Sequence, residues 1–238
     1  MTEPLLSELA PRLYRLQIPG GAAHLLNAYL WCGDDGVTLV DTGWPGSGDV
    51  IERALTALGR GKSDVVRVVL THFHDDHAGA AAEVAAWGRV EVVAGAGDAR
   101  FITGEQAGPL PVLTVAELAI HAQPTDPPHG PLVRVDREVR DGDVLDFAGG
   151  ARVVAVPGHT PGSIALYLPA VDAILTGDAV AELQGEIILG VFNSNREAAR
   201  SSLDAIVATT AQIAGFGHGD PILHDASRCI AHAQDPFA

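Results

Sequence analysis

The chain has 238 residues, 47% of them hydrophobic, with 15 basic and 30 acidic residues and a formal net charge of −15. This length allows one large domain or two small ones, and no stretch approaches the 18 or so uninterrupted apolar residues of a membrane span. Because so negative a surface repels a phosphate backbone, the composition argues against a nucleic-acid partner.

Two features of the sequence predict a cytoplasmic protein. The first residues, MTEPLLSELAPRLYRL, carry two acids before the first arginine and lack a long apolar run, so they do not read as a secretory signal. The two cysteines, Cys32 and Cys229, cannot form a disulfide framework and are expected to be small buried residues in a reducing compartment.

Short β-branched runs alternate with helical patterns in the first half, which is typical of an α/β protein. Helices are expected at 49–58, where Asp49 and Glu52 have the spacing of a capping box, and at 78–87. A second capping-box pair, Thr114 and Glu117, predicts a short helix, and the prolines of 121–131 predict a loop. The expected strands lie at 12–18, 27–32, 36–40, 64–70 and 90–95.

The second half repeats this alternation without repeating the sequence. A helix is expected at 196–208, with Asn195 as its N-cap. The expected strands lie at 132–135, 143–147, 151–156, 163–168, 171–176 and 211–216. Because each half alone would have a thin core, we predict one domain over 1–238 with two pseudo-equivalent halves, about 1–120 and 132–238.

Five apolar runs end in a histidine or an aspartate. VTLV ends in Asp41, RVVL leads to a cluster that begins with His72, and three later runs lead to His159, Asp178 and His218. In open α/β sheets, ligands gather beyond one set of strand ends, so residues far apart in sequence converge there. We therefore expect these five side chains to meet at one edge of the fold.

The stretch VVLTHFHDDHAGA (68–80) places three histidines and two aspartates in six positions. His72 and His74, two residues apart in an extended turn, can point to one ion, while Asp76 and His77 begin a helix and face a second point nearby. Imidazoles and carboxylates are the ligands that zinc and similar ions prefer. This spacing arises by chance in roughly one of a thousand chains of such composition, so the loop predicts half of two metal sites.

Three strand-end residues complete the two sites. We assign His159 to the first ion, His218 to the second, and Asp178 to both, because a negative bridge offsets the repulsion of two dications roughly 3.5–4 Å apart. The expected cofactors are two divalent metal ions, zinc first, with iron or manganese as alternatives. Taken singly, the other histidines are expected to be surface or capping residues: His24, His121, His129, His224 and His232.

These motifs resemble the metallo-β-lactamase superfamily. The resemblance implies a four-layer αββα sandwich of two mixed β-sheets, with a metal cleft along one edge. The matching pieces follow the family's order over most of the chain: VDTG (40–43), THFHDDHAGA (71–80), VPGHTPGS (156–163), TGD (176–178) and GHG (217–219).

The resemblance also implies a role for each site residue. Asp41 in such proteins usually braces the histidine loop from behind the ligands. The implied ligands, in agreement with the assignment from spacing, are His72, His74, His159 and Asp178 for the first ion and Asp76, His77, Asp178 and His218 for the second.

Departures from the subfamily patterns narrow the activity. True β-lactamases of this superfamily generally lack the bridging aspartate, so Asp178 argues against that activity. Glyoxalase II enzymes carry a long helical tail after their last histidine, whereas 20 residues follow His218. Acyl-homoserine lactonases often have a tyrosine three residues beyond the bridging aspartate, where this chain has Ala181.

The expected chemistry is hydrolysis of a small-molecule thioester, lactone, ester or amide by a metal-bound hydroxide. A water that bridges two metals has its pKa lowered from about 15.7 towards about 7, and one metal polarises the scissile carbonyl. Asp178 would hold the metal pair, and Asp76, once free of its ligand role, would pass a proton to the leaving group.

Substrate contacts are expected from three loops, 19–27, 101–131 and 179–186. His24 is a candidate substrate contact, and Tyr29 is expected to pack in the core. The expected partner is a small molecule, with neither nucleic acid nor membrane, and a homodimer is left open.

Three other classes of function compete with hydrolysis. A persulfide dioxygenase-like oxidoreductase would keep a similar ligand set but use a single iron, and a nuclease would need a basic surface, against the charge of −15. A non-catalytic binding module would have lost ligands, whereas all seven are present.

Overall fold

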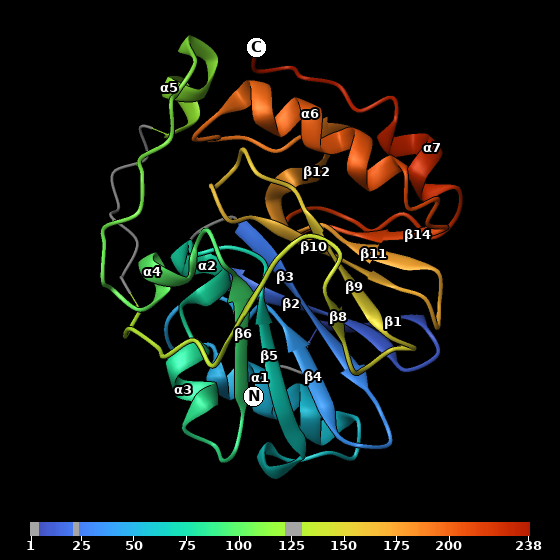
Figure 1. Cartoon of the computed structure of the whole chain (residues 1–238). Coiled ribbons are helices and arrows are strands. Elements are labelled where there is room, and N and C mark those ends of the chain that lie inside the picture. The colour runs from blue at the N-terminus through green and yellow to red at the C-terminus, as the bar shows by residue number, and fades with distance from the viewer. Residues whose placement is uncertain (1–4, 21–23, 122–129) are drawn as a thin grey trace.

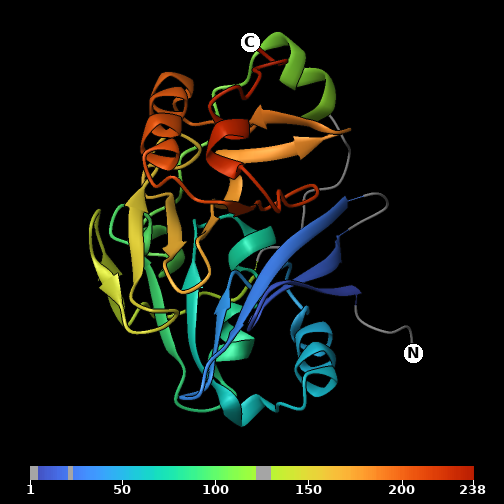
Figure 2. The ribbon, with the colours of Figure 1, turned by 90° about the vertical axis from the view of Figure 1, so that its right-hand side faces the viewer.

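The computed structural model describes residues 5–20, 24–121 and 130–238, and its elements form four layers (Figures 1 and 2). Two β-sheets lie face to face in the middle, and helices cover the outer face of each. Three clusters of buried apolar side chains fill the spaces between these layers. The arrangement confirms the expected αββα sandwich of two mixed sheets.

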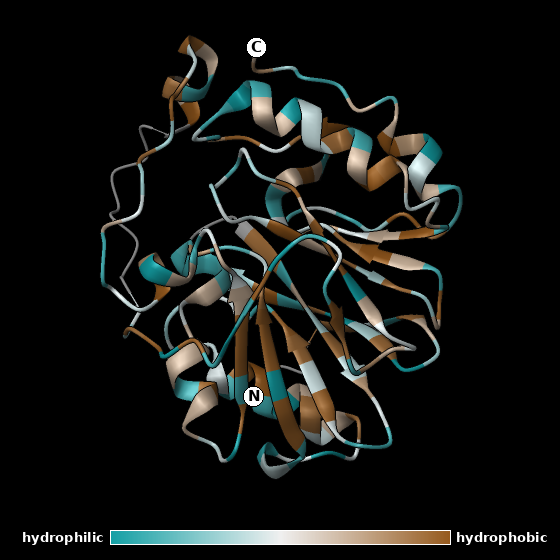
Figure 3. Ribbon diagram, viewed as in Figure 1, coloured by the Kyte–Doolittle hydropathy of each residue, from teal (hydrophilic) through white to brown (hydrophobic). Residues whose placement is uncertain are grey.

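The first sheet has seven strands, and the pairing of neighbouring strands changes from antiparallel to parallel at β4. Strands β1 to β4 pair antiparallel, and β4 to β7 pair parallel. The central parallel strands are covered on both sides, so most of their residues are apolar, as Figure 3 shows for β4, β5 and β6. The polar exceptions are Thr38 in β4, Arg67 in β5 and Glu91 in β6. In sheet order the strands are β1 (Leu5–Ala10), β2 (Leu13–Gly20), β3 (His24–Cys32), β4 (Val37–Val40), β5 (Val65–Leu70), β6 (Glu91–Gly95) and β7 (Arg137–Val139).

The second sheet has five strands from the second half of the chain. Only β14 pairs parallel with its neighbour, β11. A separate antiparallel hairpin consists of β12 (Val180–Leu183) and β13 (Glu186–Leu189). In sheet order the strands are β14 (Ile213–Gly215), β11 (Ala173–Leu175), β10 (Ile164–Leu168), β9 (Ala151–Ala155) and β8 (Val144–Leu145).

Helices α1 and α3 cover the first sheet, and α6 and α7 cover the second. None of the helices in the described part of the chain has the length and apolar character needed to cross a bilayer. The helices are α1 (Gly48–Ala57), α2 (Asp75–Ala78), α3 (Ala81–Ala85), α4 (Ala99–Ile102), α5 (Val115–His121), α6 (Arg196–Val207) and α7 (Ala226–Ile230), with short 3₁₀ turns η1 (Lys62–Asp64) and η2 (Gly177–Ala179).

The prediction of a capping box for the first helix is wrong. Helix α1 begins one residue earlier than expected, after Ser47, and no side chain of its own segment caps it. Instead, the amide of Gly48 donates to the carboxylate of Glu83 in α3 (3.3 Å), and Glu52 pairs with Lys62. A tertiary contact thus replaces the local cap that the sequence pattern favoured.

The helix expected at 78–87 is broken into two short pieces, α2 and α3. A Cβ on Gly79 would lie 2.1 Å from the Asp75 carbonyl oxygen and 2.4 Å from Cδ of Pro45, so the chain passes very close to a neighbouring loop there. The next amide, of Ala80, donates to the Gly43 carbonyl (3.2 Å). This tight docking explains why the helical pattern is interrupted.

Two further expectations about the second half are wrong. Residues 132–135 form no strand, because Val133 is buried against the first sheet without pairing in it, and the strand begins at Arg137. The expected loop 179–186 is largely β12 and the start of its hairpin. The sequence analysis also missed β1, β13, α4 and α7, whose short runs show little periodicity.

Two predicted caps are confirmed. Asn195 accepts the amide of Ala198 (3.0 Å) at the start of α6. At α5, the amide of Thr114 donates to the Glu117 carboxylate (2.9 Å), and the amide of Glu117 donates to the Thr114 hydroxyl (3.1 Å). The fully buried Glu117 also accepts hydrogen bonds from the Phe192 amide (2.8 Å) and Arg196 (2.9 Å), so it joins α5 to the segment before α6.

Glu117 predicts a pH-dependent contribution to stability. Burial by itself raises the pKa of this carboxyl, but the amides of Thr114 and Phe192 and the guanidinium of Arg196 outweigh burial, and the pKa falls below its ordinary value of 4.5. The carboxylate therefore stabilises the fold above about pH 4.5, and this contribution is lost as the pH falls through the folded-state pKa. Glu117→Gln should lower the free energy of unfolding by about 2 kcal/mol at neutral pH.

The measurement is urea unfolding of the wild type and Glu117→Gln at neutral and acidic pH, with Glu197→Gln as the control on an exposed carboxyl of α6. The difference between wild type and Glu117→Gln should shrink at acidic pH. A difference that stays constant across the range would contradict a charged role for Glu117.

Candidate metal centre

The predicted ligands meet at one edge of the two sheets. Asp41 directly follows β4, the loop Thr71–His74 follows β5, and Asp178 lies in η2, which is separated from the end of β11 by one residue. Two groups form there, and within each group one ligand atom per residue lies within 4.8 Å of the others. The groups are His72, His74 and His159, and Asp76, His77, Asp178 and His218.

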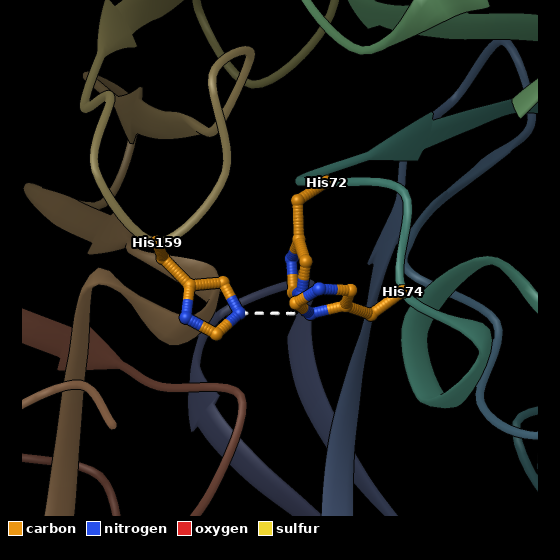
Figure 4. A group of neighbouring side chains, drawn as sticks. All are labelled: His72, His74 and His159. Carbon is orange, nitrogen blue, oxygen red and sulfur yellow. Dashed lines mark hydrogen bonds between the residues drawn. The ribbon is translucent and has the colours of Figure 1, made fainter. Parts of the chain in front are cut away.

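The three histidines of the first group face a common point (Figure 4). Nε2 of His159 lies 2.9 Å from Nδ1 of His74, and the ring centroids of His72 and His159 are 4.6 Å apart. Burial and the neighbouring imidazoles lower the pKa of all three, that of His74 to about 3. They are therefore neutral at pH 7, with lone pairs available to a cation.

Hydrogen bonds behind the rings decide which nitrogen faces the centre. Nδ1 of His159 donates to the Val191 carbonyl (3.0 Å), which leaves the lone pair on Nε2. The Thr71 hydroxyl donates to Asp41 (2.8 Å), so it accepts from Nδ1 of His72 (3.0 Å). Nε2 of His72 is then a buried acceptor pointing into the centre.

The second group contains both signs of charge. Nε2 of His77 lies 3.2 Å from Oδ1 of Asp178, and Nε2 of His218 lies 3.3 Å from Oδ2 of Asp76. Oδ2 of Asp178 is 3.4 Å from His218 and 3.8 Å from Nε2 of His159. The Asp178 carboxylate therefore lies between the two groups.

The opposite charges of this group shift each other's pKa against the effect of burial. Burial disfavours charge on every member, but the carboxylates raise the pKa of His77 well above 6.5 and that of His218 to about 10. The histidines in turn lower the pKa of Asp76 to about 2 and that of Asp178 well below its ordinary value. Both carboxylates are thus ionised at neutral pH.

Asp41 makes the contacts expected of a residue that braces the histidine loop. Its Oδ1 accepts the amide of Thr71 (2.8 Å), and its Oδ2 accepts the Thr71 hydroxyl (2.8 Å) and Nδ1–H of His77 (2.8 Å). The backbone of Asp41 has a φ of 63°, in the left-handed region that aspartate tolerates better than most residues. This turn directs the carboxylate at the loop.

The donor set fits divalent cations. Neutral imidazole nitrogens and carboxylate oxygens are the ligands of zinc and related ions. Among the described residues, Nε2 of His72, Nε2 of His77 and Oδ1 of Asp178 are buried without a hydrogen-bond partner. Buried polar atoms are normally paired, so three such atoms within one centre indicate a bound cation that they contact.

The residues considered as substrate contacts in the sequence lie outside the two ligand groups. His24 begins β3, but its side chain lies outside the described residues. Tyr29 packs in the core as predicted, with its hydroxyl donating to the Phe216 carbonyl (2.7 Å). Ala181 lies in β12.

Two polar residues beside the centre escaped the sequence analysis. The Asn27 amide nitrogen donates to the carbonyls of Phe216 (3.0 Å) and Gly219 (2.8 Å), on either side of His218. Asp98 is fully buried and accepts hydrogen bonds from the loops of His72 and His159. A polar residue inside or just after an apolar run, as in LLNAYL and VVAGAGD, was the available signal.

Comparisons with known proteins agree with this geometry. The family model described as metallo-beta-lactamase superfamily matches residues 24–218. A probable metallo-hydrolase, YflN of Bacillus subtilis, is 28% identical over 203 residues, 77% of this chain and 75% of that protein. A hydroxyacylglutathione hydrolase of Hyphomonas neptunium is 31% identical over 114 residues, 48% of this chain and 33% of that protein.

Solved structures share the fold. A metallo-beta-lactamase family protein of Thermus thermophilus, TTHA1429, superposes with a TM-score of 0.72 at 28% identity, over 94% of this chain and 78% of that one. A metallo-beta-lactamase of Cronobacter sakazakii with a HARLDQ motif gives a TM-score of 0.69 at 23% identity, over 92% of this chain and 81% of that one.

Removal of the central carboxylate tests the ligand assignment. Asp178→Ala should lower the bound metal well below two ions per chain and abolish activity, because both groups lose a neighbouring oxygen. Elemental analysis of the purified protein measures this. His224→Ala, which alters an exposed histidine, should leave the metal content unchanged, and two tightly held ions in Asp178→Ala would refute the assignment.

Gly217 tests how closely the centre is packed. A Cβ at this position would lie 1.9 Å from Oδ1 of Asp178 and 2.6 Å from Cε1 of His77, so Gly217→Ala must displace a ligand. We expect a loss of activity of about 100-fold together with weaker metal binding. Gly88→Ala, whose Cβ meets nothing within 4 Å, serves as the control and should behave as wild type in both assays.

Proposed function

We propose that this chain, which belongs to the metallo-beta-lactamase superfamily, is a hydrolase that uses two divalent cations to cleave a thioester, lactone, ester or amide bond of a small molecule. The observation that carries the proposal is the position of Asp178. Its two oxygens lie 3.2 Å from His77 and 3.8 Å from His159, within reach of both groups of ligands. A carboxylate between two such groups suits a pair of cations.

The residues that would hold the cations divide as the two groups do. His72, His74 and His159 would bind the first and Asp76, His77 and His218 the second, with Asp178 shared. When bound, such cations lower the pKa of a water from about 15.7 towards about 7 and polarise a carbonyl, which supplies the nucleophile and the stabilisation of the oxyanion at neutral pH.

The chain's own residues then have three tasks. Asp41 accepts Nδ1–H of His77, which makes Nε2 the nitrogen that faces the centre. Asp178 remains ionised because the histidines lower its pKa, so its charge offsets that of the cations. Asp76, half-buried, ionised and near His218, is the candidate that, once free of its ligand role, takes the proton released by the attacking water and passes it to the leaving group.

The curated relatives support acyl chemistry. Two of them are named hydroxyacylglutathione hydrolases, and a third is named a probable metallo-hydrolase. These names support hydrolysis of a carboxylic derivative. The residues of the centre do not favour one of these substrate classes over another, because they would contact the cations and not the acyl group of the substrate.

A single-metal oxidoreductase is the second candidate function. The three histidines form a complete group by themselves, with one ligand atom each within 4.8 Å of the others, and three such ligands suffice for one iron. In this second candidate function, the chain would be an oxidoreductase similar to the persulfide dioxygenases.

The test combines elemental analysis of purified protein with a substrate panel of lactones, thioesters and β-lactams. We expect about two divalent ions per chain and hydrolysis of a lactone or a thioester well above the rate of Asp178→Ala. One iron per chain, with oxygen consumption on glutathione persulfide and no hydrolysis, would overturn the proposal.

A further inference from the structure

A buried carboxylate outside the two ligand groups joins the loops that carry the three histidines. Asp98 precedes α4 and is fully buried. Its Oδ2 accepts the amide of Phe73 (3.1 Å) and the hydroxyl of Thr160 (2.6 Å), and its Oδ1 accepts the amide of Gly162 (2.7 Å). Although Asp98 stands at the N-cap position of α4, its side chain makes no capping hydrogen bond to that helix.

Each partner of Asp98 is close in sequence to a candidate ligand. Phe73 lies between His72 and His74, so fixing its amide fixes the backbone on both sides. Thr160 directly follows His159. The first loop leaves β5 of the seven-stranded sheet, and the second follows β9 of the five-stranded sheet, so one carboxylate connects ligands that come from opposite sheets.

Close backbone packing lets so short a side chain reach both loops. A Cβ on Gly162 would lie 2.1 Å from the amide nitrogen of Asp98, and one on Gly97 would lie 2.8 Å from Cα of Gly162. The Thr160 hydroxyl is also 2.7 Å from Oγ of Ser163, which accepts the Thr160 amide (3.0 Å). Thr160 and Gly162 of GHTPGS thus build the contact with Asp98, and Ser163 supports Thr160.

We propose that Asp98 is a positioning residue that sets the separation between His159 and the His72–His74 pair, and thereby the affinity of the three-histidine group for its cation. Asp98 does not touch the ion and acts through Phe73 and Thr160. Its role complements that of Asp41, which contacts Thr71 in the loop after β5 and His77 in the adjoining α2. The inference rests on the proposed function only in requiring that the three histidines bind a cation.

Asparagine is the appropriate substitution at Asp98. It keeps the size of the side chain but offers one acceptor oxygen, so at least one of the three donors would face an amide NH₂ group. Loss of such an outer contact typically weakens metal binding by about 10- to 100-fold. We expect this loss in Asp98→Asn.

The experiment is a titration of metal-free protein with Zn²⁺ against a competing chelator, repeated with Co²⁺ and its visible absorption. A His218→Ala background removes a ligand of the second group only, so that the titration reports on the three histidines. Asp98→Asn should show the weaker Zn²⁺ affinity and an altered Co²⁺ spectrum, while thermal unfolding of the metal-free chain shows that it is folded.

Three further variants separate positioning from a general effect on folding. Thr160→Val removes one donor to Asp98 and should weaken Zn²⁺ binding, whereas Thr160→Ser keeps the hydroxyl and should restore it. The double variant Asp98→Asn/Thr160→Val should lose less than the sum of the single losses. Asp136→Asn alters a carboxylate that accepts the Val92 amide of β6 (3.0 Å), away from both loops, and should bind Zn²⁺ as the wild type does.

Wild-type affinity in Asp98→Asn, or an equal loss in Asp136→Asn, would overturn the positioning role and leave the proposed function intact. A wild-type chain that binds no divalent cation would overturn both. If Asp98→Asn fails to fold, the Thr160→Val and Thr160→Ser pair decides, and equal affinities in these two variants would count against the role.

Discussion

The meeting of histidines and carboxylates at a single point is the constraint on which the rest of this structure depends. Burial removes the water that would otherwise solvate these groups, and it lowers the pKa of the three-histidine group while opposite charges hold Asp76 and Asp178 ionised. Such an arrangement is costly without a ligand, because unpaired buried polar atoms lose their hydration. The fold must therefore hold the side chains in place from behind.

Two buried aspartates supply this support, and each holds a different part of the centre. Asp41 uses both carboxylate oxygens on the loop after β5, which orients His77 and, through Thr71, His72. Asp98 uses both of its oxygens to connect that loop with the one that carries His159. Because a carboxylate that accepts several hydrogen bonds cannot rotate freely, each brace restricts the ligands it supports, and preorganised ligands bind a cation at lower cost in conformational entropy.

Much of the fold was predictable because its signals are local. The parallel strands β5 and β6 are apolar apart from Arg67 and Glu91, and the caps of α5 and α6 need only neighbouring residues. The errors arose where a distant contact prevailed over a local pattern. Glu83 replaced the expected cap of α1, contact with Pro45 interrupted the helix expected at 78–87, and Val133 reached the core without joining a sheet.

The sequence by itself identified the residues that meet at the candidate metal centre, since the spacing of His72, His74, Asp76 and His77 and the polar ends of the later strands point to ligands irrespective of their neighbours. Only the tertiary structure decided which nitrogen of each ring faces the centre and which carboxylate bridges two loops. Asp98 is the clearest case, because its partners lie 25 to 64 positions away in the chain and hydrogen bonding across two sheets leaves no periodic trace in the sequence.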